Sequence, residues 1–225
     1  MNLQFLRKSE SDSINKQILR AALIVGVVSI LARAAAVIKE LIVARFFGRS
    51  DALDAFLIAF LLPAFFVTIV SGTVGSALVP VFVQVQQKQG RDAAEKLLSS
   101  MTIISAATLA GIAVLLGLLA PFYLPYVAHG FSPEKIRLTR ELLYMLLPWV
   151  VLSGTAQFVT YVLNAGEKFA LPALVPLVTP LVVIGSIVLV ARTWGPFALS
   201  AGSVAGSVLE TAFLVGMLRA HGCST

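Results

Sequence analysis

The sequence predicts an all-α polytopic membrane protein with six transmembrane helices. Hydrophobic residues make up 58% of its 225 residues, charged residues only 12%, and the mean hydropathy is +0.93. Soluble domains carry about 25% charged residues. The apolar residues also form continuous runs of about 20 residues or more, the length that a spanning helix needs. These runs lack the period-two alternation of a transmembrane β-barrel, so helices are predicted.

Six apolar runs are separated by short polar segments. They cover residues 18–45, 53–84, 97–119, 142–163, 169–191 and 197–218. Backbone groups in lipid must be satisfied within the segment, which favours helix for each run. We expect a polar leader at 1–17, one transmembrane lobe at 18–219 and a short tail at 220–225. No small-residue cleavage site follows a short apolar core, so the first run is expected to act as an uncleaved insertion signal.

The first run carries Arg33, Lys39 and Glu40 within its apolar sequence. A charge near the bilayer centre costs about 2.5–3.5 kcal/mol, so such residues usually face a protein interior or a water-filled cavity. Arg33 and Glu40 share a helix face about 10 Å apart along the axis. Lys39 and Glu40 are adjacent and are expected to point apart. Two interpretations stay open: an anion-facing cavity inside the bundle, or Arg33 pairing with an acid elsewhere in the bundle.

A short turn, Phe47 to Asp51, leads into the second run. Asp51 is predicted as the N-cap of the next helix, which places Asp54 in its first turn. Carboxylates are favourable there because of the free N–H groups and the helix dipole. Asp54 therefore has a capping interpretation and a second one, at the mouth of a cavity. This run contains Pro63, Gly72, Gly75 and Pro80, and two interpretations stay open: an interrupted helix, which often lines transport pathways, or ordinary close packing at small residues.

The later segments contain predicted breaks. A polar loop is expected at 84–96, and the longest loop at 121–140, where Pro121, Pro125, Gly130 and Pro133 act as breakers. Ser132-Pro133-Glu134 is typical of a helix start. In the fifth run, prolines at 172, 176 and 180 lie at four-residue spacing. They are expected to weaken the hydrogen-bond ladder along one side of that helix.

Glu210 is the one acidic residue of the sixth run, 197–218. It is a candidate partner for Arg33 or Lys39. The alternative is a site for a proton or a cation, because an ionisable residue inside a membrane segment is often functional.

Other chemistry finds little support in the sequence. The single cysteine is Cys223, and the two histidines, His129 and His221, are far apart, so no metal site and no cofactor are expected. No nucleophile and base are arranged as in an enzyme site. The net charge of +6 comes from basic residues scattered through loops, which suits membrane orientation rather than nucleic-acid binding.

Basic residues predict the orientation. If the N-terminus is inside, the inner segments hold Arg7, Lys8, Lys16, Arg20, Lys88, Arg91, Lys96, Lys168 and Arg219. The outer segments then hold Arg45, Arg49, Lys135, Arg137, Arg140 and Arg192. The excess inside favours a cytoplasmic N-terminus, and an even number of spans places the C-terminus there too.

Two stretches resemble a known family. ELIVARFFG…DAFLIAFLLP…GSALVPVFV, Glu40 to Val83, and NAGEKFALPALVP, Asn164 to Pro176, are similar to the MurJ (MviN) lipid II flippases of the multidrug/oligosaccharidyl-lipid/polysaccharide exporter superfamily. The resemblance implies one lobe of a two-lobe carrier with about fourteen spans. It places the family's cavity cations at Arg33 and Lys39 and its acid after the first loop at Asp54.

The resemblance implies transport of a lipid-linked sugar diphosphate across the bacterial cytoplasmic membrane, for peptidoglycan synthesis. Its partners would be membrane lipid and a second lobe or a second copy of the chain. One region departs from the family. Where typical members carry an arginine pair and a Glu-Gly, residues 64–72 read AFFVTIVSG. The alternatives are therefore a flippase for another lipid-linked polysaccharide precursor, or an inactive lobe.

Overall fold

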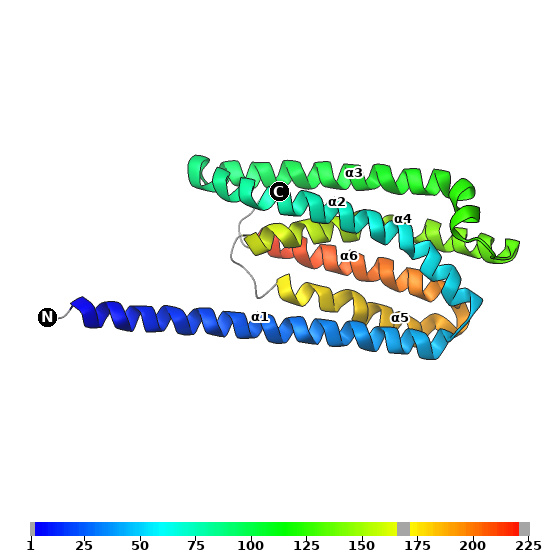
Figure 1. Cartoon of the computed structure of the whole chain (residues 1–225), viewed down its shortest axis with the longest axis horizontal. Helices are drawn as coiled ribbons and strands as arrows, with labels where there is room; N and C mark the ends of the chain where they lie inside the picture. Colours follow the sequence, from blue (N-terminus) through cyan, green and yellow to red (C-terminus); the bar gives the residue numbers. More distant parts are fainter. Residues whose placement is uncertain (1–2, 166–171, 221–225) are drawn as a thin grey trace.

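The computed structural model describes residues 3–165 and 172–220. This part of the chain contains helices and turns and no strand (Figure 1). Its elements are α1 (Leu3–Phe47), α2 (Asp51–Gln89), α3 (Arg91–Val127), α4 (Pro133–Ala165), the 3₁₀ helix η1 (Pro172–Leu177), α5 (Val178–Trp194) and α6 (Phe197–Ala220).

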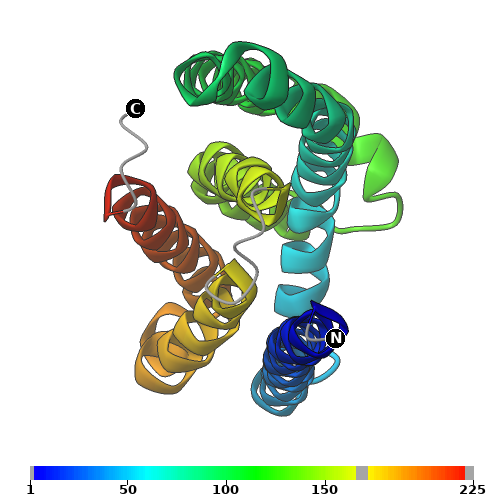
Figure 2. The ribbon, with the colours of Figure 1, turned by 90° about the vertical axis from the view of Figure 1, so that its left-hand side faces the viewer.

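Helix α4 lies in the middle of the bundle. Seen along the helices, α3, α2, α1, α5 and α6 are arranged around it (Figure 2). It packs against α2, α3, α6 and η1. The largest buried cluster joins α2, α3 and α4, with fully buried Val67, Leu109 and Leu146 among its members. Side-chain packing of this kind drives helix association in a membrane, where lipid tails are as apolar as the helices.

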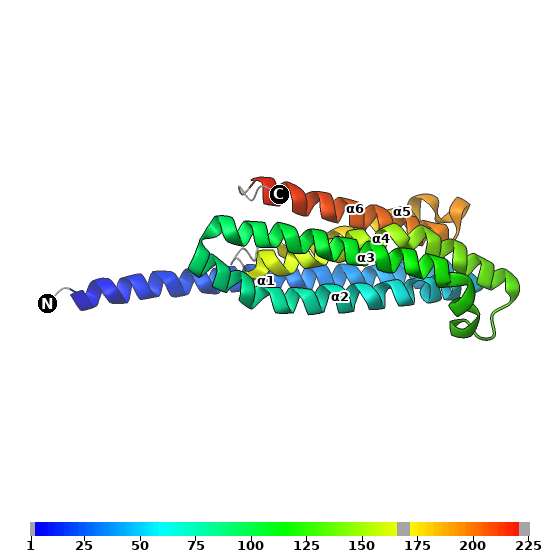
Figure 3. The same ribbon diagram turned by 90° about the horizontal axis from the view of Figure 1, so that it is seen from above.

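Helix α1 lies at the edge of the bundle. It packs mainly on η1 and α5, and its N-terminal part extends past the ends of the other helices (Figures 1 and 3). Val43 is the one buried residue among the α1 side chains that the structure describes. It joins Val183, Ile187 and Leu199 in a small cluster. The helix begins at Leu3, so most of the predicted polar leader is helical and continuous with the first span.

The fold class is confirmed. Five segments of the described chain are long and apolar enough to cross a membrane: Asp51–Gln89, Asp92–Val127, Pro133–Tyr161, Leu174–Trp194 and Phe197–Gly216. They correspond to the second to sixth predicted runs. The first predicted run lies in α1. The chain is a multi-pass membrane protein.

Two predicted loops were wrong. The expected loop at 84–96 is reduced to Gly90, with φ of 86°, because α2 continues to Gln89 and α3 begins at Arg91. The expected loop from 121 is helical up to Val127, with Pro121 and Pro125 inside α3. Proline is tolerated in membrane helices when its surroundings satisfy the freed backbone groups. The helix ends instead at Val127, and the N–H of the C-cap residue Ala128 donates to the Leu124 carbonyl.

Other local predictions were correct. Helix α4 begins at Pro133, and the Ser132 hydroxyl accepts a hydrogen bond from the Lys135 backbone N–H at 3.3 Å. The prolines of the fifth run give a 3₁₀ segment, η1, before the α-helical ladder of α5 starts at Val178. Residues 166–171, in the second stretch of family resemblance, lie outside the described part of the chain.

Candidate functional site

The charges of α1 lie on its exposed surface. Arg33 and Glu40 are exposed, and the side chain of Lys39 is 28% exposed. Lys39 Nζ lies 2.8 Å from Glu40 Oε1, so the expectation that these neighbours point apart was wrong. The long, flexible lysine stem allows its ammonium to reach the adjacent carboxylate along the helix surface. The α1 helix therefore neutralises one of its own cations.

Arg33 differs from Lys39. The ion pairs among the described residues do not include Arg33, so the predicted pairing with an acid elsewhere in the bundle is not seen. Arg33 is also exposed, so the helices of this chain do not enclose its side chain. A cavity around Arg33 needs a wall from outside these helices. Its role as an anion ligand remains a prediction.

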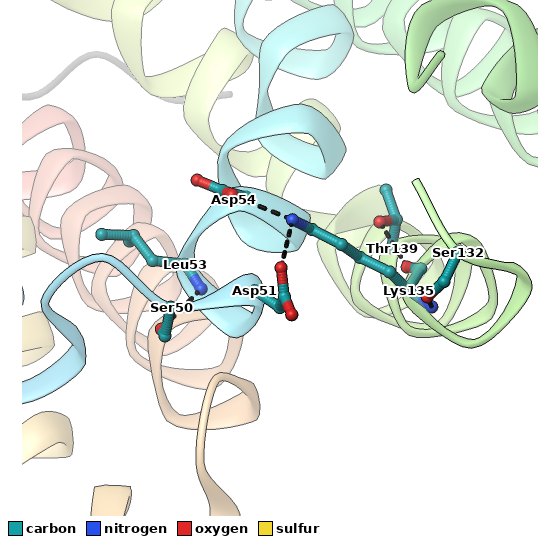
Figure 4. Close-up of polar contacts among 7 residues, drawn as sticks. All are labelled: Ser50, Asp51, Leu53, Asp54, Ser132, Lys135 and Thr139. Carbon is teal, nitrogen blue, oxygen red and sulfur yellow. Dashed lines mark hydrogen bonds and ion pairs between the residues drawn. The ribbon is translucent and has the colours of Figure 1, made fainter. Parts of the chain in front are cut away.

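A group of three charges joins the first turns of α2 and α4. Lys135 Nζ lies 2.6 Å from Asp51 Oδ1 and 2.9 Å from Asp54 Oδ2 (Figure 4). The lysine side chain is 11% exposed, while those of Asp51 and Asp54 are 87% and 57% exposed. The ammonium also lies 4.0 Å from the centroid of the Phe131 ring, within cation–π distance. Asp54 is thus paired with Lys135 of α4, and its role at a cavity mouth remains a prediction.

The N-cap of α2 is Ser50, so the prediction of Asp51 was wrong by one residue. The Ser50 hydroxyl accepts a hydrogen bond from the Leu53 N–H at 3.3 Å. This leaves the Asp51 carboxylate free to bind Lys135. Sequence reasoning missed Lys135, although a signal existed: runs two and four both start after outer loops, so their first turns lie at the same end of the bundle.

Glu210 is partly buried between α5 and α6. The Thr179 hydroxyl donates a hydrogen bond of 2.9 Å to Glu210 Oε2. The ion pairs of the described residues do not join Glu210 to Arg33 or Lys39, the partners expected from the sequence. Thr179 is the second residue of α5, just after the 3₁₀ segment, so the acid of α6 lies beside the helix break.

The comparison with protein families identifies the chain. The family model described as lipid II flippase MurJ matches residues 43–225. The chain belongs to the lipid II flippase MurJ family. It is 27% identical over 217 residues to a probable lipid II flippase MurJ of Synechocystis, covering 90% of this chain and 40% of that protein. It is 30% identical over 206 residues to the lipid II flippase MurJ of Burkholderia cenocepacia, covering 87% and 39%.

Solved structures agree with this fold. Lipid II flippase MurJ in an inward closed conformation superposes with a TM-score of 0.73 at 22% identity, covering 86% of this chain and 41% of that one. A MOP superfamily transporter from Pyrococcus furiosus, whose binding pocket is described as having reverse polarity, gives a TM-score of 0.72 at 13% identity, covering 88% of this chain and 44% of that one. The chain spans about two fifths of the length of the curated MurJ relatives it matches.

Proposed function

We propose that this chain is one lobe of a MurJ-family flippase that moves a lipid-linked sugar diphosphate across the bacterial cytoplasmic membrane. The observation that carries the proposal is the family match over residues 43–225, combined with an exposed cation on a helix otherwise suited to lipid. Arg33 and Lys39 lie before the matched region, so their role rests on position and charge.

In the proposed mechanism, Arg33 and Lys39 contact the diphosphate while the lipid tail stays in the membrane. Contacts between a cation and a phosphate strengthen where water is scarce. Arg33 is free of ion pairs among the described residues, and Lys39 would exchange the Glu40 carboxylate for a phosphate oxygen. Alternation between two openings would carry the headgroup across.

The proposal includes a second wall for the cavity. Lobes of such carriers are repeats related by an axis along the membrane normal. The exposed face of α1 would then meet either a separately encoded lobe or a second copy of this chain. Single cysteines on α1, crosslinked and combined with native mass measurement in detergent, test the pairing. A strictly monomeric protein that still moves lipid would refute it.

The sequence of residues 64–72 is a reason to consider a second candidate substrate. Phe65, in the stretch that replaces the arginine pair of typical members, is 55% exposed on α2. An apolar surface there would select less strongly for a highly charged headgroup. The second candidate is a flippase for another lipid-linked polysaccharide precursor, and the third is an inactive lobe.

Reconstitution tests these candidates. The chain is placed in liposomes that contain fluorescent lipid II or another fluorescent sugar linked to undecaprenyl diphosphate, and inward movement is followed by quenching from outside. Arg33→Ala should abolish transport and Arg33→Glu should be at least as damaging, because like charge repels phosphate. Arg49→Ala, an exposed arginine in the turn after α1, is the control. Wild-type transport by Arg33→Ala would reject the anion role, and transport of neither lipid would support the inactive lobe.

Labelling in cells tests the proposed orientation. Ser132 and Gln89 are exposed and lie at the two ends of α3. Single cysteines at these positions, with Cys223 replaced, should differ: an impermeant reagent should reach position 132 and not position 89. The reverse result would invert the topology.

A further inference from the structure

The break between η1 and α5 lies against α6. Pro180 has no N–H, so the α-helical bond that it would otherwise give to the Pro176 carbonyl cannot form. In membrane carriers, carbonyls freed where a helix is interrupted are typical ligands for Na⁺ or a proton. Helix α6 packs against both η1 and α5, which places its side chains beside this break.

A glycine brings the two helices close together at this point. A Cβ on Gly206 would lie 2.9 Å from the Thr179 Cα and 3.1 Å from its Oγ1, closer than real Cβ atoms approach backbone. The absence of that side chain allows Thr179 to reach one turn along α6. There its hydroxyl donates to Glu210 Oε2 at 2.9 Å. The hydroxyl and the carboxylate are therefore held in one place by backbone packing.

Glu210 has few sources of positive charge around it. The elements η1, α5 and α6 carry two basic residues, Arg192 and Arg219, and residues 142–163 of α4 carry no charge. Arg219 lies nine residues after Glu210, about 14 Å along α6. Arg192 lies thirteen residues after Thr179, about 20 Å along α5. The charged residues of α4, Glu134, Lys135, Arg137, Arg140 and Glu141, lie in its first nine residues.

The cations of α1 do not supply the missing charge. Lys39 is paired with Glu40, and the described ion pairs do not join Arg33 to Glu210. Lys168 lies outside the described residues, and the experiment below includes it. An ionised carboxylate inside a membrane bundle needs a counter-charge, because its burial alone is costly.

We propose that Glu210, Thr179 and the backbone carbonyls at the η1–α5 break form a binding site for a monovalent cation with the chemistry of Na⁺. The carboxylate supplies the charge, and the hydroxyl and carbonyls supply neutral oxygen ligands. Binding would hold α5 and α6 together at the break. This proposal does not depend on the proposed lipid transport.

Binding of ²²Na⁺ to the purified chain in nanodiscs tests the site, with choline chloride holding the ionic strength constant. Glu210→Gln keeps the size and removes the charge, and should weaken Na⁺ binding by about tenfold or more. Thr179→Val should weaken binding less. Thr160→Val is the matched control, because among the described residues the Thr160 hydroxyl donates to the Ala156 carbonyl of its own helix. Lys168→Gln should leave binding unchanged.

The possible results of this experiment either support or overturn a cation site at Glu210. Saturable Na⁺ binding that is lost in Glu210→Gln and kept in Thr160→Val supports the proposal. If Glu210→Gln does not fold, Thr179→Val and Glu210→Asp still decide between a weakened site and no site. Absence of saturable ²²Na⁺ binding in the wild type overturns the proposal, as does binding that Glu210→Gln retains. Na⁺ binding that appears only in Lys168→Gln also overturns it, since Lys168 would then be the counter-charge.

Discussion

Helices α4 and α1 show two ways of placing a helix in a membrane protein. Along α4, residues such as Leu142, Leu146 and Phe158 are fully buried among the other helices. Along α1, Leu23, Ile30 and many other apolar side chains are exposed, which suits lipid or another protein surface. The central helix is fixed by packing on several sides, whereas α1 rests mainly on η1 and α5.

The charges follow the same division. Lys135, at the start of α4, binds two carboxylates of another helix. On α1, Lys39 binds a carboxylate of its own helix, and Arg33 is in none of the ion pairs of the described residues. Charges that join helices act on the stability of the fold, whereas we propose that the charges of α1 bind a ligand. Substitutions on the two sides should therefore act on different properties.

The largest effect is expected from glycine substitution. Gly206→Val should lower the free energy of unfolding by about 1–3 kcal/mol, because the new side chain meets the Thr179 backbone and forces α5 and α6 apart. Gly26→Val on α1 is the matched change. A Cβ there would have no neighbour within 4 Å, so stability should hardly change. Unfolding by heat in detergent, followed by the fluorescence of Trp149 and Trp194, measures both. If Gly206→Val and Gly26→Val lowered the free energy of unfolding equally, α1 would be packed as tightly at Gly26 as α6 is at Gly206, contrary to the structure.

The second largest effect on stability is expected from removing Lys135, which binds Asp51 and Asp54 and so joins α4 to α2. Lys135→Ala leaves Asp51 and Asp54 facing each other in one helical turn without their cation, so the protein should unfold at a lower temperature. Arg137→Ala is the control, because Arg137 is 73% exposed and makes one contact of 3.7 Å within its own helix. The fall in unfolding temperature, measured in detergent, should be larger in Lys135→Ala than in Arg137→Ala.

Measurements at low and high salt test whether charge causes the difference between Lys135→Ala and Arg137→Ala. Exposed ion pairs are screened as ionic strength rises. The difference between Lys135→Ala and Arg137→Ala should therefore shrink in high salt. A difference that salt leaves unchanged would mean that packing of the lysine stem, including its contact with Phe131, carries the effect.

Sequence reasoning was reliable where one residue type has one physical consequence. Long apolar runs gave the spans, Ser132-Pro133 gave the start of α4, and closely spaced prolines gave the break before α5. It was less reliable where the outcome depends on surroundings. Proline at 121 and 125 predicted a loop, yet the helix continues to Val127.

The site shows the same limit more strongly. The predicted site residues, Arg33, Lys39, Asp54 and Glu210, stand out because charge is rare in this sequence. Their partners could not be deduced from one sequence, because they depend on which helices become neighbours. Asp54 binds Lys135, and Glu210 accepts from Thr179, a residue with no outstanding feature in the sequence.

The smallest effect on stability is expected on α1, from breaking the pair between Lys39 and Glu40. Their side chains are 28% and 67% exposed, and exposed pairs contribute roughly 0–1 kcal/mol. Glu40→Gln should therefore leave the unfolding temperature nearly unchanged. Asp54→Asn provides the comparison, because that carboxylate joins two helices. A fall in Glu40→Gln as large as that in Asp54→Asn would mean that the charges of α1 hold the fold together, and their proposed availability to a diphosphate would lose its physical basis.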